Sequence, residues 1–275
     1  MIPYAEVIGD PIAQSKSPLI HKFWLDKLGI PGTYRATRVS PDALPAYLAE
    51  RRADPAWRGC NATIPHKQAA LPLLDAVLGS AARVGAANCL YRAPGGLIGE
   101  NSDVEGVAEA LDLPEREPGV TCLIGAGGAA RAALFALDRA GVRDLRLIVR
   151  QPAKGEALLA EFGMAGRVFG FIDSDVALRL ADTVINASPL GMLAQPAMPR
   201  DVLDALALTA ADALVFDMVY APLETGLLAA ARALGRQPVD GLTMLIGQAD
   251  LAFQLFFKAA APRHHDAELR ALLTA

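Results

Sequence analysis

The sequence predicts an α/β protein with two domains, one of which is a doubly wound Rossmann sheet. Its length of 275 residues suits about two domains of ordinary size. Strand-like and helix-like segments alternate along the chain, as is typical of parallel sheets covered by helices. A glycine-rich turn, "LIGAGGAAR" at residues 123–131, follows one such strand and begins a helix.

In the first third of the chain, a strand is expected at "YAEVIG", residues 4–9, and another at "TYRATRV", residues 33–39. A helix is expected between them at "SPLIHKFWLDKLG", residues 17–29. Ser17 with the following proline suits an N-cap and a first helical turn, and Gly29 suits the C-terminus of the helix.

Three further segments complete this region. "GCNATIP", residues 59–65, predicts a strand that ends at its proline. "KQAALPLLDAVLG", residues 67–79, predicts a helix interrupted at its proline. "NCLYRA" and "GLIGEN" are joined through "PGG" and predict a hairpin over residues 88–101.

The segment "LDLPEREPG", residues 111–119, is expected to be a loop or linker, and the alternation is regular after it. Strands are expected at "VTCLIGAGG", "DLRLIVR", "RVFGFI", "DTVINAS" and "ALVFDMVY", with helices between them. The central strands are apolar on both faces and rich in β-branched residues. Such strands are typical of a parallel sheet buried between two layers of helices.

The glycine-rich turn is a candidate phosphate-binding loop. Gly125, Gly127 and Gly128 leave the backbone open to a pyrophosphate, and the N-terminus of the following helix favours an anion. The alternative is a tight turn without a ligand. The predicted strand and helix flank the turn in the order that a dinucleotide site requires, so we expect a nucleotide cofactor.

Charges near the next strand indicate which nucleotide is bound. Arg150 and Lys154 follow "DLRLIVR", where an NAD site usually has an acidic residue, and cations there suit a 2′-phosphate. Asp144 is acidic but begins that strand, at the opposite end of the sheet. We therefore expect NADP. The alternative that Arg150 is only solvated at a helix start leaves NAD open.

Polar clusters at the ends of other predicted strands are candidate substrate ligands. Ser15 and Ser17 are two residues apart, so in an extended segment they face the same side and can together bind a carboxylate. Lys67 starts a helix after a strand, and Asp103 ends "GENSD". Three of these residues could instead have an ordinary structural role. Ser17 and Asp103 could be N-caps, and Lys67 could be a solvated surface lysine.

Composition argues against several other classes of protein. A net charge of −4 without a basic cluster gives no electrostatic footprint for nucleic acid, and no apolar run is long enough for a membrane span. Three widely spaced cysteines without a CxxC pair argue against a disulfide framework and a zinc site. We expect a small-molecule substrate, no metal, no nucleic acid, no membrane and a cytoplasmic location.

Eight segments, taken in order, resemble the shikimate dehydrogenase family over essentially the whole chain. They are "GDPIAQSKSPLIHK", "NATIPHK", "GAANCLY", "GENSD", "IGAGGAAR", "INASPLGM", "FDMVYAPLET" and "DGLTMLIGQA". The joint pattern is much more specific than any one segment. The resemblance implies reversible reduction of 3-dehydroshikimate to shikimate with NADPH, by a monomer or homodimer.

The resemblance also implies the domain organisation. A substrate domain at residues 1–104 is completed by C-terminal helices at 238–275, and a Rossmann NADP domain occupies 105–237. Lys67 and Asp103 then form the catalytic pair in a cleft between the domains. Lys67 is the expected proton-transfer group, and Asp103 is its orienting partner.

The remaining site residues are also implied by the resemblance. The substrate-binding residues are Ser15 and Ser17 for the carboxylate, Thr63, Asn88, Asp103 and Gln248 for the ring hydroxyls, and Tyr220 nearby. The cofactor-binding residues are Gly125, Ala126, Gly127, Gly128, Ala129, Arg150, Lys154, Ser188, Met218, Gly241 and Met244.

Several positions depart from the family pattern. His66 stands where phenylalanine is common, whereas Ser102 and Ser188 replace threonines and keep a hydroxyl. Val149 and Gln151 replace the asparagine and threonine of the usual Asn-Arg-Thr, which removes two donors to a 2′-phosphate.

Two alternatives stay open. One is a related enzyme that prefers quinate, an aminated analogue of shikimate, or NAD. The other is a regulatory protein that binds the cofactor without useful turnover, and intact Lys67 and Asp103 count against it.

Overall fold

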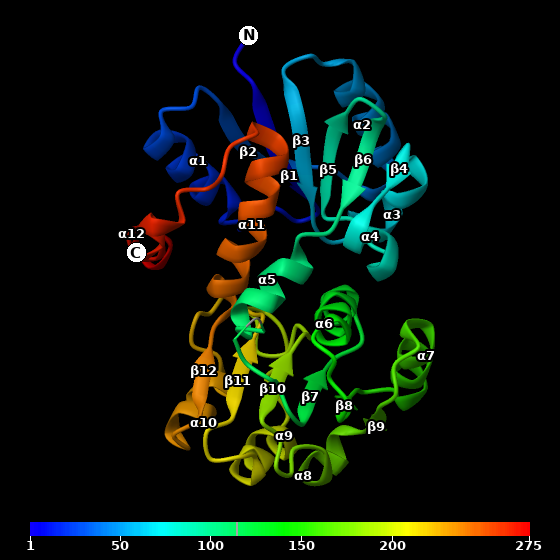
Figure 1. The fold of residues 1–275 in the computed structure, drawn as a ribbon, viewed down its shortest axis with the longest axis vertical. Helices are drawn as coiled ribbons and strands as arrows, with labels where there is room; N and C mark the ends of the chain where they lie inside the picture. Colours follow the sequence, from blue (N-terminus) through cyan, green and yellow to red (C-terminus); the bar gives the residue numbers. More distant parts are fainter. Residues whose placement is uncertain (114) are drawn as a thin grey trace. The chain divides into compact units, whose positions relative to one another are not determined.

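The computed structural model describes residues 1–113 and 115–275. The chain forms two compact units: one consists of Met1–Asp103 and Leu245–Ala275, and the other of Val104–Met244. Each unit contains a six-stranded sheet with helices packed on it (Figure 1). The predicted α/β class with two sheets is therefore confirmed.

The first unit begins with alternating strands and helices. Its elements are β1 (Tyr4–Gly9), α1 (Ser17–Leu28), β2 (Thr33–Arg38), α2 (Leu44–Ala53), β3 (Trp57–Ala62), α3 (His66–Ala69), β4 (Ala76–Val77), α4 (Gly79–Val84), β5 (Cys89–Ala93), β6 (Gly96–Glu100), most of α11 (Gly241–Phe257) and α12 (Asp266–Thr274).

The strand order of this sheet is β2-β1-β3-β5-β6-β4. β1 is parallel to β2 and β3, whereas β5 is antiparallel to both β3 and β6, which confirms the predicted hairpin. The C-terminal ends of β1, β3 and β6 therefore lie at the same edge of the sheet, together with the start of β5. The segments that carry Ser15, Lys67, Asn88 and Asp103 leave or enter the sheet at this edge.

The alternating side chains of β1 separate the core of the first unit into two layers. Ala5 and Val7 belong to a cluster with Phe256 of α11, whereas Ile8 belongs to a second cluster with Leu48 of α2. The sheet thus has α11 against one face and α2 against the other (Figure 1).

Glu6 is a charged residue inside the second layer, and it is fully buried. One carboxylate oxygen accepts hydrogen bonds from Tyr47 at 2.8 Å and Arg51 at 2.7 Å; the other accepts from Arg35 at 2.9 Å and from the Thr37 hydroxyl. Burial alone raises the pKa of Glu6, but these four hydrogen bonds outweigh it and hold the pKa below its ordinary value of 4.5.

The second unit continues from the end of β6. Its elements are α5 (Asp103–Ala110), β7 (Thr121–Ile124), α6 (Gly128–Arg139), β8 (Leu145–Ile148), α7 (Pro152–Phe162), β9 (Arg167–Phe169), α8 (Ser174–Ala177), β10 (Thr183–Asn186), α9 (Arg200–Ala205), β11 (Leu214–Asp217), α10 (Gly226–Ala233) and β12 (Gln237–Val239). Pro114, in the predicted linker, lies outside the described residues.

The strand order of the second sheet is β12-β11-β10-β7-β8-β9, and every neighbouring pair is parallel. Read from β9, this is the 3-2-1-4-5-6 order of a doubly wound dinucleotide-binding fold. The order reverses between β7 and β10, and ligands of such sheets bind beyond the C-terminal strand ends at that point. The glycine-rich turn follows β7, and Ser188 follows β10.

The predicted N-cap role of Ser17 is wrong. Lys16 occupies the N-cap position of α1, and its side chain makes no capping hydrogen bond. The Oγ of Ser15 instead accepts a hydrogen bond from the backbone N–H of Ser17 at 3.3 Å. Because Lys16 has helical dihedral angles (φ −86°, ψ −7°), the segment is also not extended as predicted.

The helix predicted over residues 67–79 is present only in its first turn. After α3 the chain forms a short 3₁₀ turn at Leu71–Leu73 and then β4, which pairs in parallel with β6. The backbone N–H groups of Asp75 and Leu78 donate to the carbonyls of Leu97 and Gly99. The free edge of β6 therefore supplies hydrogen-bond partners that the local sequence does not reveal.

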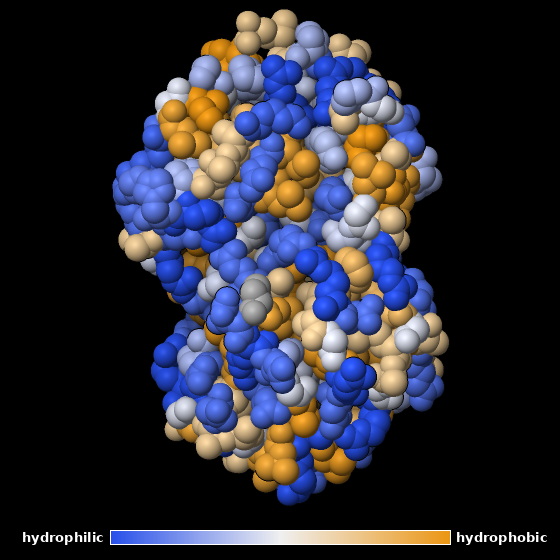
Figure 2. All heavy atoms as spheres, viewed as in Figure 1, coloured by the Kyte–Doolittle hydropathy of each residue, from blue (hydrophilic) through white to orange (hydrophobic). Residues whose placement is uncertain are grey.

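Membrane, metal and disulfide sites depend on the hydropathy, the potential metal ligands and the cysteines of the described residues. Within residues 1–113 and 115–275, no helix has both the length and the hydropathy of a membrane span, and no cluster of potential ligands could hold a metal ion. On the face seen in Figure 2, hydrophobic residues form small groups between hydrophilic ones. All three cysteines are free and buried.

Replacing Glu6 with glutamine removes the charge that faces Arg35 and Arg51 while nearly preserving the volume of the side chain. We expect the free energy of unfolding to fall by about 3 kcal/mol, because two cations lose their buried partner. Urea denaturation at neutral pH measures this loss. The matched control is Glu50→Gln, because Glu50 pairs with the same Arg51 at 2.9 Å but has a side chain that is 74% exposed.

The control should lose less than about 0.5 kcal/mol, and equal losses in the two variants would contradict a stabilising role for Glu6. The pKa of Glu6 in the folded protein lies below 4.5, so its stabilising contribution is complete above that pH. The difference between the wild type and Glu6→Gln should therefore shrink as the pH falls below 4.5.

Candidate active site

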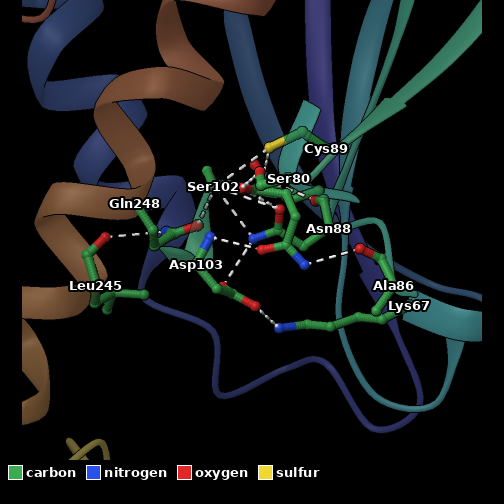
Figure 3. Close-up of polar contacts among 11 residues, drawn as sticks. Lys67, Ser80, Ala86, Asn88, Cys89, Ser102, Asp103, Leu245 and Gln248 are labelled. Carbon is green, nitrogen blue, oxygen red and sulfur yellow. Dashed lines mark hydrogen bonds and ion pairs between the residues drawn. The ribbon is translucent and has the colours of Figure 1, made fainter. Parts of the chain in front are cut away.

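Three chain segments bring polar side chains together at the shared edge of the first sheet (Figure 3). Lys67 lies in α3, just after β3; Asp103 is the first residue of α5, just after β6; and Asn88 directly precedes β5. Because β3, β5 and β6 are neighbours in the sheet, these residues meet although they are distant in sequence.

Lys67 and Asp103 form an ion pair. The Nζ of Lys67 donates to Oδ2 of Asp103, and the two side chains are 24% and 8% exposed. The second oxygen of Asp103 accepts a hydrogen bond from Nδ2 of Asn88 at 2.8 Å. The carboxylate is thus fixed from two sides, while the amine keeps access to solvent.

Asn88 uses its whole amide to hold the segment from which Asp103 projects. Its Oδ1 accepts from the backbone N–H of Ser102 at 2.7 Å, and its Nδ2 also donates to the Ser102 hydroxyl at 3.1 Å. The Asn88 side chain is buried. These contacts give Asn88 a positioning role in addition to its predicted role as a substrate ligand.

Asn101, rather than Asp103, receives the hydrogen bond at the start of α5. The backbone N–H of Asp103 donates to Oδ1 of Asn101 at 3.0 Å, and Nδ2 of Asn101 donates to the carbonyl of Ala86 at 2.8 Å. The carboxylate of Asp103 is therefore not used as a helix cap and remains available to Lys67.

Ser102 connects this cluster to α11. Its hydroxyl donates to Oε1 of Gln248 at 3.2 Å, and Nε2 of Gln248 donates to the carbonyl of Leu245 at 3.0 Å. The thiol of Cys89 lies 3.3 Å from the same hydroxyl, and burial raises the pKa of Cys89 to about 12, so it stays protonated. Sequence reasoning noted Ser102 only as a replaced threonine and gave Asn101 and Cys89 no role.

The predicted carboxylate-binding serines lie near the same sheet edge, after β1. Ser17 is buried and Ser15 is half-buried. Lys16, between them, points elsewhere, because its Nζ donates to the Leu273 carbonyl in α12 at 2.6 Å. Thr63 continues from β3, with its N–H donating to the Ile8 carbonyl at 2.9 Å. Within the described residues, Ser15, Ser17 and Thr63 make no hydrogen bond to the Lys67–Asp103 pair.

His66 precedes Lys67 and is fully buried. Its Nε2 lies 2.7 Å from the carbonyl of Val39, so this nitrogen carries the proton. The bond anchors the start of α3 to the chain after β2, which fixes the backbone from which Lys67 extends.

In the second unit, the glycine-rich turn has the geometry of an anion site. Gly125 adopts a left-handed φ of 112°, where a side chain would be strained, and a Cβ on Gly127 or Gly128 would meet open space. α6 begins at Gly128, and its N-cap residue is Gly127, which has no side chain that could cap the helix. The turn, with Ala126 and Ala129, therefore presents unblocked backbone N–H groups that fit a phosphate.

Two cations lie just after the end of β8. Arg150 and Lys154 are both exposed there. Asp144, at the start of the strand, pairs with Arg146 at 3.1 Å and Arg167 at 3.2 Å. The hydrogen bonds from Arg146 in particular lower the pKa of Asp144. These residues fit a 2′-phosphate better than a bare ribose.

A buried polar chain links the ends of β10 and β11. The hydroxyl of Ser188 donates to Oδ1 of Asn186 at 2.6 Å, and Nδ2 of Asn186 donates to Asp217 at 2.9 Å. Asp217 also accepts from the Thr225 hydroxyl at 2.7 Å, and burial raises the pKa of Asp217. Sequence reasoning identified Ser188 but missed the other three residues.

The remaining predicted site residues of the second unit are not part of this chain of hydrogen bonds. Gly241 packs so closely on the Met218 carbonyl that a Cβ would collide with it. Met244 is buried three residues further along α11. Tyr220 follows β11, is half-buried, and has its pKa raised by burial.

Comparison with known proteins identifies the relatives of this chain. Residues 7–90 match the family model "Shikimate dehydrogenase substrate binding domain". A "Shikimate dehydrogenase (NADP(+))" from Sphingopyxis alaskensis is 53% identical over 274 residues, covering 99% of this chain and 97% of that protein.

Solved structures give the same result. Shikimate 5-dehydrogenase from Thermus thermophilus, in complex with NADP(H) and shikimate, is 35% identical with a TM-score of 0.85, covering 98% of this chain and 99% of that chain. A quinate dehydrogenase from Corynebacterium glutamicum in complex with NAD is 32% identical with a TM-score of 0.86, with the same coverage of both chains.

The Asn88 network predicts a measurable effect on stability. Asn88→Ala leaves the buried N–H of Ser102 and one oxygen of Asp103 without their partner, so we expect a loss of about 2 kcal/mol in the free energy of unfolding. Guanidinium denaturation measures it. Gln254→Ala is the control, because the Gln254 amide also bonds a carboxylate, that of Asp250 at 2.9 Å, but is exposed. A loss no larger than that of the control would exclude the positioning role.

Proposed function

Because the chain belongs to the shikimate dehydrogenase family, we propose that it is an NADP-dependent oxidoreductase that interconverts shikimate and 3-dehydroshikimate. The observation that carries this proposal is the ion pair between Lys67 and Asp103 at the edge of the first sheet. A cofactor-binding protein without turnover has no need of a partly exposed amine held by a buried carboxylate.

The cofactor assignment follows from the residues of the second unit. When bound, NADP(H) accepts or supplies the hydride. The backbone N–H groups at the start of α6 would bind its pyrophosphate, and Arg150 with Lys154 would bind the 2′-phosphate. We propose that Ser188 and Met218 also bind the cofactor, and that Gly241 and Met244 lie near its nicotinamide.

Lys67 carries the proton in this proposal. Oxidation of a secondary alcohol to a ketone removes a hydride from carbon and a proton from oxygen. In that direction the amine of Lys67 takes the hydroxyl proton, and in reduction the ammonium returns a proton to the carbonyl oxygen. Asp103 holds Lys67 in place and accepts a hydrogen bond from a substrate hydroxyl, because only part of its acceptor capacity is used.

The substrate would be held by neutral hydroxyl and amide groups. We propose that Ser15 and Ser17 bind the carboxylate, and that Thr63, Asn88 and Gln248 bind ring hydroxyls, with Tyr220 nearby. Buried Ser17 and half-buried Ser15 lose little solvent on binding. Their hydroxyls bind an acid group without the strong Coulomb attraction of a cation. Selectivity for the substrate carboxylate therefore depends on the positions of these hydroxyls.

The domain roles are part of the same proposal. Residues 1–104 and 238–275 would bind the substrate, and 105–237 would bind the cofactor; the match of residues 7–90 to a substrate-binding domain supports the first assignment. The cytoplasmic location and the state as monomer or homodimer stay predictions.

The activity itself is tested with the purified chain by following the absorbance of reduced nicotinamide. We expect turnover of shikimate with NADP to exceed turnover of shikimate with NAD and of quinate with either cofactor. Faster turnover of quinate, or of an aminated analogue, would favour the first alternative activity. Cofactor binding without turnover of any of these acids would favour the regulatory one.

Lys67→Ala should lower kcat by about 10²- to 10⁴-fold, which is the usual contribution of a general acid or base. The Michaelis constant for shikimate should change much less, because Lys67 acts mainly on the reacting proton. Steady-state kinetics with NADP measure both. Lys22→Ala is the control, because Lys22 pairs with Asp26 on α1 and its side chain is 69% exposed. A near-normal kcat in Lys67→Ala would refute the proton-transfer role.

Replacing both Ser15 and Ser17 with alanine should raise the Michaelis constant for shikimate by about tenfold or more, because each lost hydrogen bond to a charged group weakens binding. The value of kcat should stay within a few-fold. Ser40→Ala, at an exposed serine, is the matched control. An unchanged Michaelis constant in the double variant would remove these serines from the carboxylate site.

A further inference from the structure

A cavity of about 480 Å³ lies in the first unit, away from the Lys67–Asp103 pair. Arg58 is near the start of β3, and Arg92 is near the end of the antiparallel β5. Both therefore lie at the edge of the sheet opposite the one that carries Lys67 and Asp103. Lys258, directly after α11, completes the lining together with the apolar Ile30, Phe256 and Phe257.

The three cations of this cavity are not neutralised. No acidic residue lines it, and within residues 1–113 and 115–275 none of the three pairs with a carboxylate. Arg58 donates to the Pro55 carbonyl at 3.3 Å, Arg92 donates to the Arg52 carbonyl, and Nζ of Lys258 lies 5.6 Å from the ring centre of Tyr91.

The neighbouring arginines, in contrast, form ion pairs with carboxylates. Arg35 and Arg51 pair with Glu6, and Arg52 pairs with Asp75. The three unpaired cations around this cavity, in a chain of net charge −4, therefore differ from the arginines beside them. Their mutual repulsion is relieved only by a bound anion or by solvent.

The backbone at Lys258 gives a second, independent observation. Lys258 has a left-handed φ of 57° at the position after a helix where glycine is usual. A side chain with a Cβ is disfavoured there, and such strain is concentrated at functional sites. Glycine would adopt this left-handed conformation without strain, but it would not supply a charge to the cavity.

We propose that this cavity binds a small anion with an apolar ring, such as an aryl carboxylate or an aryl phosphate. The partly exposed Leu255, Phe257 and Ile30 contact the ring, while Arg58, Arg92 and Lys258 bind the anionic group. The volume is in the range of small-molecule sites, which combine an apolar wall with a few charged groups. Gln248 and Phe257 are nine residues apart along α11, or about 14 Å, so this site is separate from the shikimate site.

The proposal is tested by isothermal titration calorimetry on the full chain, with 2-naphthoate and 2-naphthyl phosphate as probes. We expect saturable binding of at least one probe at one site per chain, and the same affinity in the presence of saturating shikimate. The uncharged analogue 2-naphthalenemethanol should bind much more weakly. Binding of neither probe, equal binding of the analogue, or competition by shikimate would each overturn the proposal.

Two variants locate the binding site. Arg92→Gln and Lys258→Gly should each lower the affinity by about tenfold, because each removes one charged contact with the anion. Lys258→Gly should also raise the melting temperature, because it relieves the left-handed strain, so weaker binding in that variant is not a sign of unfolding. Lys22→Gln is the control for a change of charge elsewhere. Unchanged affinity in both cavity variants would overturn the proposal.

Discussion

The ion pair between Lys67 and Asp103 is the interaction on which the account of this protein depends. The two residues are separated by 36 positions in the chain, and they meet because β3, β5 and β6 are neighbours in the first sheet. Asn88 enters β5 between them and bonds both Asp103 and the preceding residue. The order of the strands therefore creates the candidate site.

Two buried carboxylates of the first unit, those of Glu6 and Asp103, differ in how many hydrogen bonds they accept. Glu6 is fully buried and accepts hydrogen bonds from four side chains, which leaves no room for a ligand. Among residues 1–113 and 115–275, only the side chains of Lys67 and Asn88 donate to the Asp103 carboxylate, and Lys67 remains partly exposed. A carboxylate can accept about four hydrogen bonds, so Asp103 keeps acceptor capacity that a hydroxyl of a substrate can use. The hydrogen bonds of Glu6 therefore stabilise the fold, whereas those of Asp103 leave the carboxylate able to bind a substrate.

Much of this arrangement could be predicted from the sequence, because the relevant signals are local. The glycine-rich turn, the apolar strands around it and the polar residues at strand ends are all visible within short segments. These segments make Lys67 and Asp103 candidates, whereas their role as a catalytic pair is implied by the family resemblance. The pairing of β4 with β6 was not predictable, since its cause is a free strand edge that comes later in the chain. The hydrogen bond from Ser102 to Gln248 joins residues 146 positions apart, so the sequence around either residue does not predict it.

A double-mutant cycle on kcat/KM for shikimate, with Lys67→Met and Asp103→Asn, tests the central claim most directly. If Asp103 acts mainly by holding Lys67, its replacement matters little once Lys67 is gone, so the double variant should be no slower than the slower single variant. Effects that multiply, so that the double variant loses the product of the two single losses, would show that the two groups act independently. That result would contradict the account given for this site.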